Sequence, residues 1–181
     1  MAIYNVFEST NMATTHYAER IFDAVCDVDV ENGTFGYLDG LADGESHTYK
    51  FVAGTKKGAF VVVADQPAWT EDTSRKTNQR KDKFVIEANT RFRVRVVKVR
   101  DEFATAVEGF TSETRANADV NKYVTIDAAT GKLVVADAPV DGAVMNAKIM
   151  RTRMIGSTLV TGVRNYGYAR KMYEVKVEDL A

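Results

Sequence analysis

The chain has 181 residues, a net charge of −1 and a single cysteine, Cys26. A domain of this size buries roughly 70% of its unfolded surface, which is enough for a self-sufficient core. One cysteine excludes an internal disulfide and a multi-cysteine metal site, and no apolar run reaches the roughly 20 residues of a membrane span. Residues 1–7 lack the features of a signal peptide, so we expect a chain made in the cytoplasm and not exported by that route.

Charge is sorted along the sequence. Residues 1–49 contain nine acids and one base, whereas residues 75–100 contain ten bases and two acids. Such regions can pair within the fold, or head to tail with a neighbouring copy or another protein.

Residues 1–20 are polar and lack a clean periodicity, which predicts an extended N-terminal arm before a single β domain over residues 21–181. Residues 26–31 alternate apolar and acidic side chains and are typical of a strand. The Asn32-Gly33 pair then predicts a hairpin turn, with residues 34–38 as the partner strand.

Residues 47–53 alternate, and residues 59–64 form a continuous apolar run typical of a strand buried on both faces. The polar stretch 65–83 follows and has no regular pattern. It is longer than an ordinary connection, which indicates either a functional loop or a segment that is disordered when free.

The sequence Arg-Phe-Arg-Val-Arg-Val-Val-Lys-Val-Arg over residues 91–100 is the clearest strand. Its apolar side chains alternate with arginines, which predicts a core face backed by a ladder of guanidinium groups. The alternation slips by one at Val96-Val97. A slip of this kind predicts a β-bulge or a strong bend where the chain passes from one sheet to another.

Further strands are predicted over residues 122–126, 132–136, 143–155, 157–163 and 173–177. The total is about nine or ten short antiparallel strands with almost no amphipathic helix. The predicted fold class is therefore all-β, a sandwich or a barrel.

Catalytic and metal-binding patterns are weak. His16 and His47 lie in no nucleophile or metal motif, and the glycines do not form a phosphate-binding loop. Residues 27–33 superficially resemble a calcium loop, but the twelfth position is Leu38 where that loop needs a glutamate. We expect a protein that is not an enzyme and has no cofactor and no metal.

Two charged ladders have the same two-residue spacing and predict a contact, either within the chain or between subunits. Opposite charges on adjacent strands contribute a few tenths to about 1 kcal/mol per pair. The candidate interface residues are the acids Asp27, Asp29 and Glu31, the arginines Arg91, Arg93 and Arg95, and the loop residues Trp69, Arg75, Lys76, Arg80 and Lys81.

A nucleic-acid interpretation is an alternative, because aromatic residues near arginine and lysine can form a positively charged stacking groove. Against it, the total charge is slightly negative, and Phe92 shares its face with valines. We therefore expect Phe92 in the core and regard nucleic acid as an improbable partner.

The stretch Asp-Val-Asp-Val-Glu-Asn-Gly-Thr-Phe-Gly-Tyr-Leu-Asp-Gly-Leu-Ala-Asp-Gly-Glu, residues 27–45, resembles a segment of tailed-bacteriophage structural proteins that are encoded near the major capsid protein. The hallmark is an acidic strand that ends in Glu-Asn-Gly, followed by Leu-x-Gly-Leu, Gly-Glu and a Tyr-containing strand. Later strands are similar in order, up to about residue 178. The chain departs from the pattern by its many arginines and lysines.

The resemblance implies a virion protein that decorates or cements the capsid by contact alone. Its partners would be the major capsid protein or another virion protein, and it would form a homo-oligomer on the virion after synthesis in the bacterial cytoplasm, with no membrane involved. A tail, connector or fibre-anchoring role, and a single-stranded nucleic-acid-binding barrel, are the alternatives.

Overall fold

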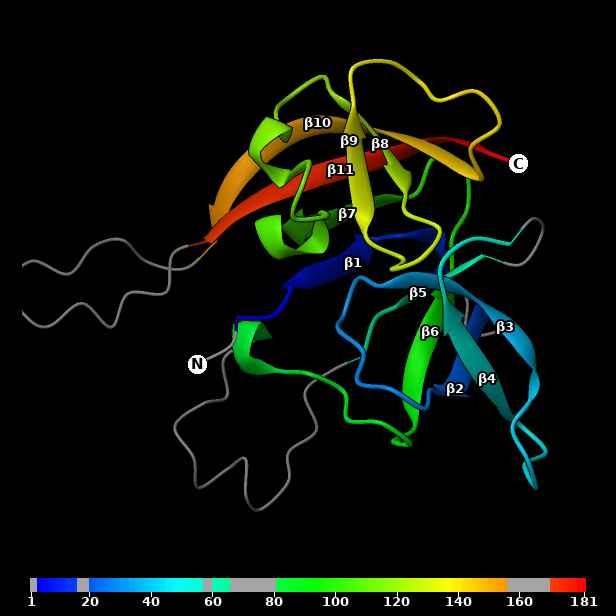
Figure 1. The fold of residues 1–181 in the computed structure, drawn as a ribbon. Helices are drawn as coiled ribbons and strands as arrows, with labels where there is room; N and C mark the ends of the chain where they lie inside the picture. The colour runs from blue at the N-terminus through cyan, green and yellow to red at the C-terminus, as the bar shows by residue number, and fades with distance from the viewer. Residues whose placement is uncertain (1–2, 16–19, 57–59, 66–80, 156–169) are drawn as a thin grey trace, which may run out of the picture.

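The computed structural model describes residues 3–15, 20–56, 60–65, 81–155 and 170–181, and it is built almost entirely of β-strands (Figure 1). The predicted all-β class is confirmed. Eleven strands within the described residues form a closed five-stranded barrel and a separate six-stranded sheet. The prediction offered a sandwich or a barrel, and the molecule combines a barrel with an open sheet.

The barrel occupies the lower part of Figure 1. Its strand order is β2-β4-β3-β5-β6, and β6 pairs back with β2 to close it. The β2–β4 pair is parallel and the others are antiparallel. The strands are β2 (Ile21–Val25), β3 (Phe35–Leu41), β4 (Thr48–Ala53), β5 (Val61–Val63) and β6 (Phe92–Val96).

The six-stranded sheet lies above the barrel and has the order β1-β7-β11-β10-β8-β9 (Figure 1). All of its neighbouring strands are antiparallel. The strands are β1 (Phe7–Asn11), β7 (Glu102–Ala106), β8 (Tyr123–Ile126), β9 (Leu133–Ala136), β10 (Met145–Ile155) and β11 (Arg170–Leu180). Short 3₁₀ turns lie in the connections between strands of the molecule: η1 (Ala13–Thr15), η3 (Lys81–Lys83), η4 (Val107–Gly109) and η5 (Arg115–Asn117).

The barrel and the sheet share a boundary at β3 and β5. Val61 and Val63 of β5 point into the barrel core, while Val62 points into the core beneath the sheet. The strand is therefore buried on both faces, as its continuous apolar sequence predicts. Phe35 of β3 is fully buried in the sheet's core, and its ring lies 5.5 Å from that of Phe103 in β7.

The slip in alternation at Val96-Val97 marks the passage between the two cores. Phe92 and Val94 are buried inside the barrel, whereas Val97 is buried in the core of the sheet. The chain leaves β6 after Val96, turns, and enters β7. The predicted bend between sheets is confirmed.

The predicted hairpin over residues 26–38 is wrong. Residues 26–30 form no strand beyond a single bridge between Val30 and Ile86, and β3 pairs with β4 and β5. The alternation misleads because Val28 is 58% exposed, so the segment does not bury one continuous apolar face. The tight turn itself is present, since Gly33 has a φ of +81°.

Part of the predicted N-terminal arm belongs to the sheet. β1 is extended, as expected, but it pairs with β7, and the Phe7 ring lies 5.3 Å from that of Phe103. Asn5 is buried beside this strand and accepts a hydrogen bond from the Thr105 hydroxyl at 3.0 Å. The strand predicted over residues 157–163 lies outside the described residues.

Candidate interaction surface

The wall of the barrel formed by β2 and β6 carries the arginine ladder. These strands are antiparallel, with Asp23 opposite Arg93, and both side chains are exposed. The acid opposite Arg93 thus comes from β2 and not from the acidic ladder, so the predicted contact of the two ladders within one chain is wrong at this position. Residues 26–30 have already left the barrel wall at that point, because Val30 bridges Ile86 instead.

The other two arginines of the ladder have partners within the fold. Arg91 forms an ion pair with Glu45. Arg95 is half-buried and donates a hydrogen bond to the Thr14 carbonyl at 3.2 Å. Burial, helped by the charge of Arg93, lowers the pKa of the Arg95 guanidinium. The acidic and basic halves of the sequence therefore pair here within the chain.

The three acids of the predicted acidic ladder have different surroundings. Glu31 is partly buried, accepts a hydrogen bond from the Asn5 amide at 2.8 Å, and forms an ion pair with Lys132 at 3.3 Å. Asp27 and Asp29 are exposed. Glu31 therefore joins the N-terminal segment to the β8–β9 region, whereas the two aspartates remain open to solvent.

The predicted loop residues Trp69, Arg75, Lys76 and Arg80 lie outside the described residues. Lys81 begins the 3₁₀ turn η3. Phe92 is only 3% exposed, and its ring packs edge-on against Phe51 inside the barrel. The expected core position of Phe92 is confirmed, and its ring offers no face for a nucleic-acid base to stack on.

The β10–β11 hairpin is a projecting feature that the sequence analysis did not single out. The two strands pair from Met145 opposite Leu180 to Ile155 opposite Arg170, whereas β8 pairs with β10 only at Ala147 and Lys148. Their far ends project beyond the rest of the sheet (Figure 1). Over residues 150–155 the outer edge of β10 pairs with no other described strand.

Two methionines are exposed along this edge. Met150 is 48% exposed and sits at an irregularity of the β10–β11 pairing between Ile149 and Arg151, and Met154 is 57% exposed. Methionine is flexible and polarisable and adapts to irregular partner surfaces. The pattern Met-Arg-Thr-Arg-Met over residues 150–154 is visible in the sequence, and its resemblance to the ladder at 91–95 is the signal that could have identified it.

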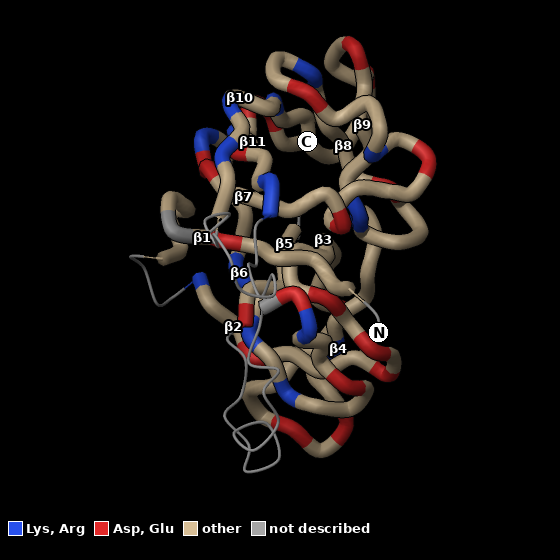
Figure 2. The backbone as a smooth tube through the Cα atoms, turned by 90° about the vertical axis from the view of Figure 1, so that its left-hand side faces the viewer, with Lys and Arg blue, Asp and Glu red and all other residues tan. Residues whose placement is uncertain are grey.

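The outer face of the hairpin carries an ion-pair network that crosses the sheet. Glu174 of β11 pairs with Arg151 and, at 2.7 Å, with Arg153, both on β10. Arg153 also reaches Glu8 on β1, over the small side chain of Ala104 in β7. The hydrogen bond that Arg153 donates to the Glu8 carboxylate is the main cause of a raised pKa for Arg153. Lysine and arginine gather on β10 and β11 in Figure 2.

A second, more buried network lies at the far end of β11, where Arg170 is opposite Ile155. Arg170 pairs with Asp82 of η3 at 3.1 Å and with Glu108 of η4. Burial would lower the pKa of Arg170, but its bonds to Glu108 and Asp82 outweigh this effect and raise it. Asp82 is fully buried, so these ion pairs tie the Arg170 end of β11, which lies opposite Ile155, to two turns.

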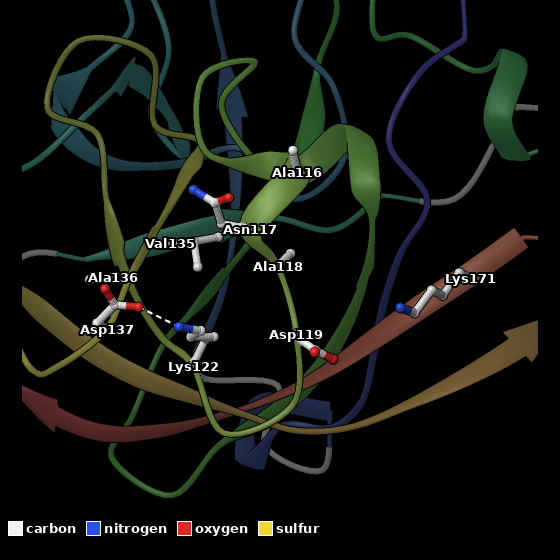
Figure 3. A pocket seen from close by; sticks show the side chains of 9 residues that line it. All are labelled: Ala116, Asn117, Ala118, Asp119, Lys122, Val135, Ala136, Asp137 and Lys171. Carbon is white, nitrogen blue, oxygen red and sulfur yellow. Dashed lines mark hydrogen bonds and ion pairs between the residues drawn. The ribbon is translucent and has the colours of Figure 1, made fainter.

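A polar groove of about 600 Å³ lies between β11, the end of β9 and the η5 region (Figure 3). Lys122 and Asp137 form an ion pair in it, which lowers the pKa of Asp137 through the hydrogen bond from Lys122. Asp119 and Lys171 line the groove from different elements (Figure 3). The mixed charges suit a polar segment of another macromolecule better than an apolar ligand.

Comparison with known proteins finds no matching family model, no matching curated protein and no matching solved structure. Within the described residues, no group of three or more histidine, cysteine, aspartate or glutamate side chains is arranged to hold a metal ion. None of the helices in the described part of the chain is long and apolar enough to cross a membrane.

Proposed function

We propose that this chain is a structural protein of a tailed-phage virion that decorates or cements the capsid through protein–protein contact, without enzymatic activity. The proposal starts from the resemblance of residues 27–45 to capsid-associated phage proteins. In the fold these residues run from an exposed acidic bend into β3 and on to the turn before β4, so several of them lie on the surface.

The observation that carries the proposal is the projecting half of the β10–β11 hairpin. It combines a strand edge that no described strand covers with two exposed methionines, Met150 and Met154. An open edge of this kind can add a strand from a partner through main-chain hydrogen bonds, with side chains supplying specificity. The buried ion pairs of Arg170 fix the far end of β11, next to the open edge of β10, so little conformational freedom is lost on binding.

Co-sedimentation with capsid shells that lack this protein is the direct test. We expect saturable binding and a higher temperature of shell disruption when the shells are decorated. The variant Met150→Asp with Met154→Asp should weaken binding at least about tenfold, because it places charge in a desolvated contact. The matched control is Leu41→Asp with Val140→Asp, which changes side chains that are 48% and 40% exposed elsewhere on the molecule.

Each other outcome points to a different role. Equal binding by both variants would contradict the hairpin as the contact surface while leaving capsid decoration in place. No binding of the unaltered chain to shells would contradict capsid decoration, and binding to purified tails or connectors would then support that alternative. Salt-dependent binding to a single-stranded oligonucleotide would support the nucleic-acid alternative.

A further inference from the structure

Two exposed tripeptides, one beside the barrel and one at the junction of the barrel and the sheet, have the same arrangement of side chains and opposite charge. In the first, which we call the acidic patch, Val28 is 58% exposed between Asp27 and Asp29. In the second, the basic patch, Val99 is 46% exposed between Lys98 and Arg100. Each patch therefore presents one apolar side chain between two like charges.

The charges of both patches have no ion pair within the described part of the chain. Exposed Arg91 of the ladder, by contrast, pairs with Glu45. No ion pair joins the four charged side chains of the two patches to an opposite charge among the described residues. Exposed charges of this kind are available to a partner of opposite sign.

The backbone of each patch is fixed by hydrogen bonds. On the acidic side, the Ala88 amide donates to the Asp29 carboxylate at 2.9 Å and the Asn89 amide donates to the Cys26 carbonyl at 2.7 Å. On the basic side, the Lys98 amide donates to the Asp101 carboxylate at 2.8 Å, and the Arg100 amide donates to the Val177 carbonyl at 2.9 Å. Both patches are thus preorganised, which lowers the entropic cost of binding.

The two patches cannot meet within one molecule, because they lie beyond opposite ends of β6. Asn89, which is bonded to the acidic side, precedes β6, and Lys98 follows it. β6 has five residues at about 3.3 Å each, so the strand alone holds the two patches roughly 15 Å apart. Only a second molecule can bring the two patches together.

We propose that the acidic patch of one copy binds the basic patch of a second copy, head to tail. A contact between different surfaces of identical chains repeats, and it forms a ring where the rotation closes or a filament where it does not. The contact is small, well below the roughly 1,000 Å² of a stable interface, so it is weak in solution and gains strength where copies are held side by side. This inference does not depend on a role in a virion.

Disulfide trapping tests the proposal directly and captures weak contacts. A chain with Val28→Cys is mixed with a chain carrying Val99→Cys under mild oxidation, and the matched control mixes the first chain with Val140→Cys, a similarly exposed valine elsewhere. The native Cys26 contributes little background, because it is buried and burial raises the pKa of its thiol. We expect at least about tenfold faster dimer formation for the Val28→Cys and Val99→Cys mixture. Equal rates would overturn the proposal.

A charge-swap series distinguishes this specific contact from non-specific association. Each swap is made in the chains that carry the cysteine pair. We expect the faster dimer formation to be lost when only one patch is reversed, either by Asp27→Lys with Asp29→Asn or by Lys98→Glu with Arg100→Glu. Reversal of both patches together should restore it. The asparagine keeps an acceptor for the Ala88 amide. Glu113→Lys with Asp141→Asn changes net charge by the same amount at other exposed sites and should have little effect.

Salt provides a second readout. Raising ionic strength from about 0.1 M to 1 M shortens the Debye length from about 10 Å to about 3 Å, and the rate advantage should fall accordingly. Loss of the advantage in the control variant, or failure of the combined swap to restore it, would overturn the proposal. Circular dichroism of each variant establishes that it is folded.

Discussion

The barrel and the six-stranded sheet solve the problem of exposed strand edges in different ways. The barrel closes on itself through β2 and β6, and most of its arginine ladder is occupied by partners within the fold. The sheet stays open, and its longest strands extend past their neighbours as a hairpin with exposed methionines. Closure favours stability, whereas the open hairpin leaves main-chain groups available for a partner.

The largest effect is expected from a substitution in the core where the barrel and the sheet meet. Phe35→Ala removes a fully buried ring that contacts Phe7, Phe60 and Phe103, and we expect a loss of about 3–5 kcal/mol in the free energy of unfolding. Denaturant titration measures the loss, and hydrogen exchange should show reduced protection in both regions. Protection lost in the sheet alone would mean that the barrel is stable by itself.

Removal of the ion pairs of Arg170, at the far end of β11, should cost nearly as much stability. Arg170→Met leaves the fully buried Asp82 and the mostly buried Glu108 without their guanidinium partner, and we expect a destabilisation of about 3 kcal/mol. The control is Arg151→Met on the same hairpin, where the arginine side chain is 70% exposed, and its cost should stay below about 1 kcal/mol. Similar melting temperatures for the two variants would contradict this difference.

A third variant tests how closely the β8–β9 turn of the sheet packs against the barrel. Gly131 has a φ of +67°, and an added Cβ would lie 2.1 Å from the Phe35 carbonyl oxygen on the barrel. Gly142 has a φ of +75° with nothing within 4 Å of an added Cβ. Gly131→Ala should therefore lower the free energy of unfolding by about 1–3 kcal/mol more than Gly142→Ala. Both alanines are strained by the positive φ, but only the one at position 131 must also displace the Phe35 carbonyl. Thermal unfolding of the pair measures the difference.

The smallest expected effect concerns the arginine ladder on the barrel wall and tests whether Arg93 interacts with Asp23. Reversing Arg93 and Asp23 separately and together should give a coupling energy of roughly 0.2–1 kcal/mol, because the two exposed side chains lie opposite each other. The same double-mutant cycle with Arg93 and Asp29 should give none. Coupling to Asp29 in a monomeric sample would contradict the register described here.

Local patterns predicted those strands whose side chains alternate or are uniformly apolar. The strands near residues 47–53, 59–64, 122–126 and 132–136 were found because each has one buried face, or two, along its whole length. β7 was missed because its sequence Glu-Phe-Ala-Thr-Ala has small side chains on both faces. The pairing order was beyond local reasoning, since strands such as β2 and β6 are neighbours only through barrel closure.

The candidate surface was predicted less well than the fold. Counting charges along the sequence indicated two opposed regions, but it could not show that Arg91 meets Glu45 in the barrel. The exposed edge of β10 depends on the shortness of β8, which is a neighbour in space and not in sequence. A surface made from unequal strand lengths is visible only once the strands are paired.

The position of β11 has a consequence for biosynthesis. This strand follows all the others in the sequence, yet it lies in the interior of the sheet between β7 and β10. Until it emerges from the ribosome, its two neighbours have no shared partner, and the sheet exists only as separate fragments. Domains generally fold as units, N-terminal parts first. Here the barrel can form before β11 is synthesised, whereas the six-stranded order of the sheet requires β11.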